Sequence, residues 1–376
     1  GARGAGEGSP AVAFALTKAR HALFTRRGEV RPGSPDDAQP PGWRRRPIRI
    51  LSIDGGGIRG IVPAMVLADI ERRTGKPIWQ LFDLIAGTST GGLIALALCV
   101  PGPEGGALHS ARDLVRFYEI GGKRVFSRSV WRKIRAVGNL VDGKYPSSGI
   151  EAVLEDCFGE ARLKDSLTET LVTAYEIERR FPFLFKSSNA KAKPHYDYPM
   201  KLVARAATAA PTYFEPVKVP IDGPSDYYAL IDGAVFACNP GMCAYVHALE
   251  RYGRDEDFLL VSLGTGELTR RLGYEDVKDW GAARWAQPVF HVMCDGLTSS
   301  VDYQLRQLLP PAPHGRRRYY RFQVRLDVGN DDMDDASVEN LRILKLLAED
   351  MLQANRSQLR TLCEHLVEYA EEAVER

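Results

Sequence analysis

The 376-residue sequence lacks several features that would assign it to a protein class at once. No run reaches the roughly 18 consecutive apolar residues of a membrane-spanning helix, so any contact with a membrane is expected from outside. The formal net charge of +2 gives no reason to expect a nucleic-acid polymer as a partner. Six cysteines form no C-x-x-C pair, and the closest two, Cys238 and Cys243, have no neighbouring histidine cluster. We therefore expect reduced thiols in a cytoplasmic protein that needs neither a metal nor a cofactor.

The first 46 residues differ in composition from the rest of the chain. Residues 28–47 are rich in proline, glycine and arginine, which is typical of a linker or an irregular arm. Residues 12–27 have the spacing of one short helix, which would pack on the main domain or on a second subunit, anchor the chain to a membrane, or stay disordered. We therefore divide the chain into an arm, residues 1–46, and a globular domain, residues 47–376, and leave homo-oligomerisation open.

From Ile48 onward, strand-like and helix-like runs alternate. Helices that alternate with buried strands predict an α/β fold, with three α/β/α layers around a largely parallel central sheet. The predicted strands cover residues 48–53, 82–86, 171–175, 228–231, 258–262 and 319–324. The predicted helices cover residues 61–73, 91–98, 150–158, 240–250, 282–309, 338–351 and 358–373.

The pentapeptide Gly87-Thr88-Ser89-Thr90-Gly91 lies between a predicted strand and a predicted helix. In that context Gly-x-Ser-x-Gly forms a sharp turn, and the flanking Gly87 and Gly91 let the backbone bend and the neighbouring elements close up. The serine side chain then lies at a helix N-terminus, where backbone N–H groups favour developing negative charge. The alternative is a tight turn in which Ser89 only caps the helix. We favour a nucleophile elbow, with Ser89 as the nucleophile of an acyl hydrolase.

A second glycine-rich segment, residues 54–60, follows the first predicted strand and satisfies the G-x-G-x-x-G pattern of dinucleotide-binding proteins. An NAD(P)-binding protein would need an acidic residue at the end of the next strand, whereas Asp83 lies at its start. Gly55–Gly57 fit an oxyanion hole better, because glycine lets backbone N–H donors approach a tetrahedral intermediate closely. Arg59 would hold this loop or add positive charge nearby.

An acyl hydrolase also needs a base, and the seven histidines stand in no catalytic-looking local context. Asp232 lies at the end of a predicted strand and is followed by Gly233. Functional groups gather at the carboxyl ends of strands in this type of sheet. An Asp-Gly pair by itself most often marks only a turn, so Asp232 is a candidate rather than an assignment at this point.

Together these motifs resemble the patatin-like phospholipase family. The matching segments, in chain order, are residues 54–60, 87–91, 204–214, 232–234 and 262–266. The resemblance covers roughly residues 48–352 and implies a Ser89–Asp232 dyad without histidine that cleaves phospholipid or lysophospholipid esters through an acyl-enzyme. It also implies that the N–H groups of Gly56, Gly57 and Thr90 hold the oxyanion. Ala234 stands where the family often has a second glycine after the aspartate.

The implied dyad raises a chemical difficulty. A free aspartate has a pKa of about 3.9, which makes it a weak base for a serine hydroxyl. We therefore expect burial to raise the pKa of Asp232. We also expect activity to persist at about pH 6, where a histidine-based triad would fade.

Within the family, residues 51–97, 320–323 and 333–337 resemble two branches. One is the plant storage and defence patatins, and the other is the bacterial phospholipases that cyclic dinucleotides or trinucleotides activate in antiphage defence. The cysteine usage and the many arginines and alanines favour the second branch. That branch implies a cytoplasmic enzyme that acts peripherally on the inner membrane when a nucleotide activator binds. The alternatives are an unregulated lipid esterase and a catalytically silent storage protein.

The stretch of residues 123–144 holds seven basic residues and one acidic residue, with Phe126 and Trp131 interleaved. One interpretation is an ordinary solvated face. The other is a surface that binds phospholipid headgroups beside the active site, since basic and aromatic residues suit an anionic interface.

Overall fold

The computed structural model describes residues 46–125, 147–221, 226–269, 271–285, 288–313, 315–326 and 332–374. The chain from Arg45 onward forms one compact unit. Apart from its last residue, the predicted arm lies outside the described residues, and so does the basic stretch from residue 126 onward. Both interpretations therefore stay predictions. None of the described helices is both long enough and apolar enough to cross a lipid bilayer.

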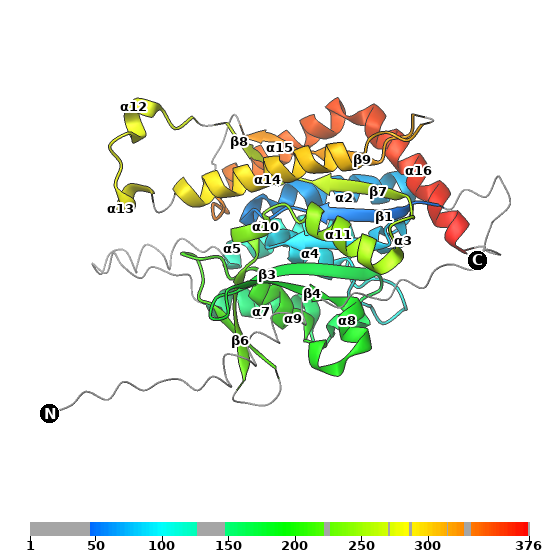
Figure 1. The fold of residues 1–376 in the computed structure, drawn as a ribbon, viewed down its shortest axis with the longest axis horizontal. Coiled ribbons are helices and arrows are strands. Elements are labelled where there is room, and N and C mark those ends of the chain that lie inside the picture. Colours follow the sequence, from blue (N-terminus) through cyan, green and yellow to red (C-terminus); the bar gives the residue numbers. More distant parts are fainter. Residues whose placement is uncertain are drawn as a thin grey trace. The chain divides into compact units, whose positions relative to one another are not determined.

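A largely parallel sheet forms the centre of the unit (Figure 1). The strand order is β5-β6-β3-β2-β1-β7-β9, with β4 beside β3. The five strands β3, β2, β1, β7 and β9 pair in parallel with their neighbours in this order. Strands β4 and β6 both pair antiparallel with β3, and β5 pairs antiparallel with β6. The strands are β1 (Ile48–Ile53), β2 (Leu84–Thr88), β3 (Glu169–Glu176), β4 (Phe181–Lys186), β5 (Val217–Pro220), β6 (Tyr227–Asp232), β7 (Phe258–Leu263) and β9 (Tyr319–Phe322), with a separate short pair of β8 (Glu267–Leu268) and β10 (Arg325–Leu326).

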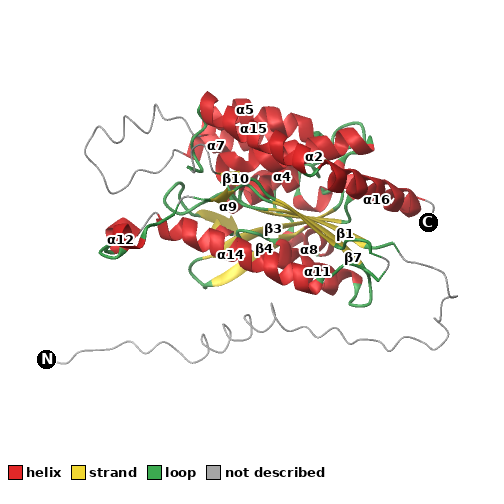
Figure 2. Cartoon of the chain, turned by 90° about the horizontal axis from the view of Figure 1, so that it is seen from above, coloured by secondary structure: helices red, strands yellow, loops and turns green. Residues whose placement is uncertain are grey.

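Helices cover both faces of the sheet, as Figure 2 shows. Alternate side chains along a strand point to opposite faces, so Leu51 and Ile53 enter one core while Ile50 enters the other. The first face is covered mainly by α2 (Ile61–Thr74), α4 (Thr90–Ala97), α5 (Ala111–Val125), α7 (Ser147–Phe158), α9 (Met200–Ala207), α15 (Val338–Ala354) and α16 (Arg356–Val374). The second is covered by α11 (Gly241–Tyr252) and α14 (Pro288–Leu308). The predicted three-layer fold is therefore confirmed.

The predicted elements occur at their predicted places with shifted ends. The strand predicted from residue 82 begins at Leu84, and the helix predicted over residues 282–309 is two elements, α13 (Ala282–Trp285) and α14. Sequence reasoning missed β4, because Pro182 within a strand-like run argues against a strand, and β4 pairs only with β3. It also missed α5, whose last turn contains Gly121 and Gly122, which disfavour helix. Short helices α3 (Ile78–Leu81), α8 (Ser187–Ala192), α10 (Ala234–Ala237) and α12 (Tyr274–Val277) complete the connections.

Asp83 anchors the amino-terminal edge of the sheet, opposite the edge at which β2 leads into Ser89. Its carboxylate accepts hydrogen bonds from Arg46 at 3.0 Å and from Nε and Nη2 of Arg49 at 3.0 Å. Burial raises the pKa of Asp83, but the hydrogen bonds and charge of Arg49 outweigh it, so the pKa is lowered. Asp83, the acidic residue considered for a ribose contact, is thus already bound by two arginines, which disfavours the NAD(P)-binding alternative.

We expect Asp83→Ala to lower the free energy of unfolding by about 3 kcal/mol, because it leaves the buried Arg49 without its anionic partner. Urea denaturation followed by circular dichroism at pH 7 measures this change. Since the folded pKa is lowered, the stabilisation is present above the unfolded pKa of about 3.9 and is lost as the pH falls through the folded value. Asp255→Ala removes an exposed carboxylate and should cost less than about 0.5 kcal/mol. Equal losses in the two variants would contradict this account.

Candidate active site

Ser89 forms the sharp turn between β2 and α4. Its φ is 54° and its ψ is −124°, a sparsely populated conformation that costs about 1–3 kcal/mol for a residue other than glycine. A methyl group at Gly87 would lie 2.1 Å from the Gly91 carbonyl oxygen, and one at Gly91 would lie 2.2 Å from the Ile53 carbonyl oxygen. Only glycine at these two positions lets β1, β2 and α4 approach so closely. The geometry is that of the predicted elbow.

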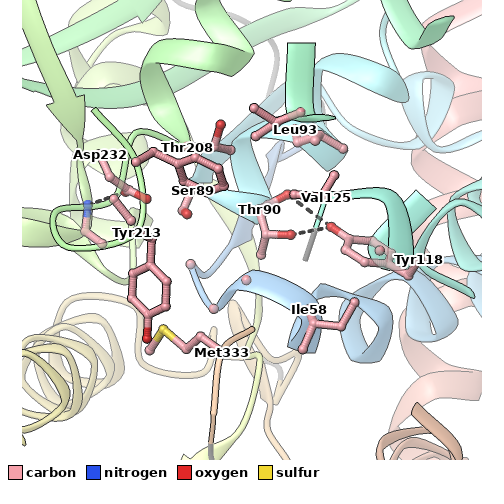
Figure 3. Close-up of a pocket in the computed structure, with 18 of the residues that line it drawn as sticks. Ile58, Ser89, Thr90, Leu93, Tyr118, Val125, Thr208, Tyr213, Asp232 and Met333 are labelled. Atoms are coloured by element: carbon pink, nitrogen blue, oxygen red, sulfur yellow. Dashed lines mark hydrogen bonds between the residues drawn. The ribbon is translucent and has the colours of Figure 1, made fainter. Parts of the chain in front are cut away.

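Asp232, the last residue of β6, lies beside Ser89 (Figure 3). The carboxyl is fully buried, and its Oδ1 accepts the Ala234 N–H at 2.8 Å. Burial raises the pKa of Asp232 to about 7, although the nearby Ser89 hydroxyl and the Ala234 N–H oppose the rise. The expected rise is thus confirmed, and the structure brings together the two residues that the sequence singled out from positions far apart in the chain.

The turn after Asp232 packs tightly against the two neighbouring strands. A methyl group at Gly233 would lie 2.2 Å from the Thr173 hydroxyl oxygen on β3, so this position has no room for a side chain. The Thr88 hydroxyl on β2 donates to the Ala237 carbonyl at 2.6 Å and lies 2.7 Å from the Thr173 hydroxyl. These contacts fix α10 and Asp232 against the strand that carries the elbow.

The glycine loop lies on the other side of Ser89. The Gly55 N–H donates to the Cys238 carbonyl at 2.9 Å, so this amide of the predicted oxyanion hole is already engaged. Gly56, Gly57 and Thr90 line the same cavity as Ser89. As the first residue of α4, Thr90 has an N–H with no acceptor within the helix.

Thr265 and Met333, from two distant segments of the chain, hold the glycine loop in shape. The sequence analysis assigned no role to either residue. The Thr265 hydroxyl donates to the Gly55 carbonyl at 2.6 Å, and a methyl group at Gly56 would lie 2.3 Å from that hydroxyl oxygen. On the far side, the Met333 carbonyl accepts the Ile58 N–H at 2.8 Å. The only sequence signal for Thr265 was its place in the matching segment 262–266.

A buried ion pair fixes the start of the loop. Arg321 Nη2 lies 2.6 Å from Asp54, both side chains are at most 5% exposed, and Arg321 Nη1 also donates to Ser262 at 2.8 Å. Arg59 is buried too, and its Nε donates to the Gly56 carbonyl at 3.4 Å, consistent with a role in holding the loop. Burial lowers the pKa of Arg59.

A narrow cavity of about 80 Å³ opens on Ser89 and Asp232 (Figure 3). Its walls are mostly apolar, with side chains from both the elbow helix and the helices around it. None of the histidines that the structure describes is among its lining residues. The apolar lining includes Leu93, Tyr118, Val153, Phe214, Phe290 and Met333.

Comparison with known proteins gives consistent similarities. The profile of the patatin-like phospholipase family matches residues 51–242. Three plant proteins align over most of both chains: "Probable inactive patatin-3-Kuras 1" from Solanum tuberosum at 30% identity (83% of this chain, 88% of that one), "Patatin-2-Kuras 3" from the same species at 31% (81% and 84%), and "Patatin-like protein 4" from Arabidopsis thaliana at 30% (82% and 84%). The solved structure of VipD from Legionella pneumophila is 10% identical with a TM-score of 0.33 over 82% of this chain and 67% of that one, which is too distant to carry an argument.

Proposed function

Because the chain belongs to the patatin-like phospholipase family, we propose that it hydrolyses the acyl esters of membrane phospholipids through a Ser89–Asp232 dyad. Family membership supports lipid acyl hydrolase activity in general. The finer proposal rests on one observation: a strained serine in an elbow lies beside a buried carboxyl of raised pKa at an apolar cavity. One plant relative is named as inactive, so sequence similarity alone does not decide catalysis.

In the proposed mechanism, Asp232 accepts the proton of the Ser89 hydroxyl as the oxygen attacks the ester carbonyl. Asp232 then protonates the leaving alcohol, which leaves an acyl-enzyme on Ser89. The same carboxylate next activates a water molecule that releases the fatty acid, while the apolar cavity holds the acyl chain. The buried Asp232 carboxyl suits both steps, because a base works best when its pKa is near the working pH.

The developing oxyanion would be held by the N–H groups of Gly56, Gly57 and Thr90. Gly55 is left out of this set because its N–H already donates to Cys238. Each donor aimed at such an oxyanion is worth about 2.7–4 kcal/mol of transition-state stabilisation in enzymes of this kind. Thr265, Met333 and Arg59 would act as positioning residues, since they hold the loop without lying at the reacting atoms.

The raised pKa changes one expectation drawn from the sequence. With a pKa of about 7, only about one-tenth of the Asp232 carboxyls are ionised at pH 6, so full activity at that pH does not follow. A pH profile therefore cannot distinguish this dyad from a histidine-based triad. The distinction requires variants in which Asp232 or a histidine is replaced.

We predict that kcat/KM for a soluble short-chain ester rises with pH and levels off above about pH 7, because the base must be ionised in the free enzyme. Below that value kcat/KM should fall about tenfold per pH unit. Initial rates with p-nitrophenyl butyrate between pH 5 and pH 9 measure the profile. A flat profile over this range would exclude Asp232 as the base.

We also predict that Ser89→Ala and Asp232→Asn each reduce fatty-acid release from phosphatidylethanolamine and phosphatidylglycerol vesicles by at least about 10³-fold. His291→Gln, which changes the histidine next to the cavity-lining Phe290, is the control and should keep activity within about twofold. Asp232→Asn should not lower stability at pH 8. A raised folded pKa means that ionising Asp232 costs stability as the pH rises from about 4 towards 7, and asparagine removes that cost. Undiminished release by Ser89→Ala would refute the mechanism.

We further propose that a cyclic dinucleotide or trinucleotide activates the enzyme, as in the bacterial antiphage branch, and that it then acts from the cytoplasm on the inner membrane. The cysteine usage and the many arginines and alanines favour this branch, and residues 320–323 and 333–337 resemble both it and the plant patatins. Both segments touch the glycine loop, through the Arg321–Asp54 ion pair and the Met333–Ile58 hydrogen bond. Arg321 and Arg59 also line a polar cavity of about 500 Å³ beside Gly55, where a bound ligand would contact the loop.

Isothermal titration of the Ser89→Ala protein with a panel of cyclic dinucleotides and trinucleotides tests this regulation. We expect one member to bind, and to raise fatty-acid release by the active enzyme at least about tenfold. If no member binds or activates, the regulatory proposal is discarded and an unregulated lipid esterase remains.

A further inference from the structure

One surface of the domain exposes large apolar side chains close together in the chain. Tyr274 of α12 is 75% exposed and Val292 of α14 is 48% exposed. Figure 1 shows α13 near the N-terminal end of α14, with α12 farther out on the segment that leads to α13, away from the central sheet. We call this the α12–α14 surface, and it consists of Leu272, Tyr274, Val289, Val292 and Met293.

The start of α14 is apolar on both of its sides. Phe290, Cys294 and Leu297 pack inward against α10 in a small apolar cluster. Val289, Val292 and Met293 of the same two turns are exposed. A helix that lies on a water-facing surface usually presents polar residues outward, whereas a helix that is apolar all round is usually buried. We therefore expect the exposed side of α14 to contact an apolar partner.

The α14 part of the α12–α14 surface adjoins the candidate active site. Phe290 and Cys294, which alternate with the exposed residues along α14, line the same cavity as Ser89 and Asp232. An acyl chain that leaves an apolar phase at this surface therefore needs to pass only one turn of helix to reach the cavity. An interface for an unrelated protein would have no reason to adjoin the acyl cavity.

We propose that the α12–α14 surface docks on a lipid bilayer and admits the phospholipid substrate past Phe290. The proposal rests on the lipid substrate of the proposed function. Trp280 and Trp285, whose ring centroids lie 5.5 Å apart, belong to the same segment as the exposed Tyr274. They support the proposal, because tryptophan and tyrosine favour the membrane–water interface.

Charge does not account for the docking. Residues 271–285 carry three basic and three acidic side chains, Arg271, Lys278 and Arg284 against Glu275, Asp276 and Asp279. The segment is neutral overall, so insertion of apolar side chains would supply the binding energy. Binding should accordingly occur with zwitterionic as well as anionic vesicles, and should change by less than about threefold between low and high salt.

Vesicle co-sedimentation of the full chain tests the proposal, with Ser89→Ala in every protein so that no lipid is digested. Replacing Tyr274, Val289, Val292 and Met293 by serine should weaken binding to phosphatidylcholine vesicles at least about tenfold. The matched control replaces Val246, Val338 and Leu346 by serine, because these apolar residues are exposed on other helices. The control should bind like its parent. Unchanged binding by the first variant, or no vesicle binding by the parent, would overturn the proposal.

Two further measurements separate the alternatives. With Ser89 intact, the four-residue variant should hydrolyse p-nitrophenyl butyrate within about twofold of the wild-type rate while it loses activity on vesicles. An equal loss on both substrates would show damage to the fold and count against docking. Gel filtration tests whether a second copy of the chain is the partner instead. If the parent is a dimer, the four-residue variant is a monomer and vesicle binding is unchanged, the surface is a subunit interface and the bilayer proposal is wrong. Failure of all ester hydrolysis by the wild type, also in the presence of the cyclic-nucleotide panel, would refute the proposed function without affecting the binding result.

Discussion

The close contact between β1, β2 and α4 is the constraint on which the site depends. The Gly91 backbone lies against the Ile53 carbonyl, and there is no space at that point for even one methyl group. This contact holds Ser89 in a conformation that it would not adopt by itself. It also places the amino-terminal turn of α4 next to the glycine loop, because that loop begins directly after Ile53. The strain at Ser89 and the close approach of its neighbours are therefore two consequences of the same packing.

Burial of the Asp232 carboxyl determines its affinity for a proton. In water an aspartate would be ionised but weakly basic, and the loss of solvent raises the pKa of Asp232 to about 7. The same loss of solvent disfavours the ionised carboxylate in the folded protein, so basicity is gained at the expense of stability. In the proposed mechanism such a carboxyl would need no histidine, because desolvation supplies the pKa that an imidazole has without any perturbation. Asp232 is only 1% exposed, which accounts for this loss of solvent.

The sequence predicted the parts of this arrangement that local patterns encode. A strand, a glycine turn and a helix adjoin one another in the chain, so the geometry at Ser89 and the glycine loop could be inferred from spacing. The role of Asp232 needed the family resemblance, because an Asp-Gly pair alone indicates only a turn. The Asp54–Arg321 ion pair could not be predicted, since its partners are 267 residues apart and no periodic pattern links them. The engagement of the Gly55 amide by Cys238 is likewise a result of packing, and it removes one donor from the predicted set.

Two cavities of opposite character meet at one thin wall. Gly55, Cys238 and Cys294 line both the apolar cavity at Ser89 and the polar cavity at Arg59 and Arg321. An acyl chain would be stable only in the first, and a charged ligand only in the second, because burying unpaired charge among apolar side chains is costly. The wall includes Gly55 of the glycine loop and Cys238, which accepts the Gly55 N–H, so a ligand in the polar cavity would contact the loop next to the proposed oxyanion donors. Regulation and catalysis would then share one structural element, and a shift of that loop by less than the length of a hydrogen bond would be enough to misalign its donors.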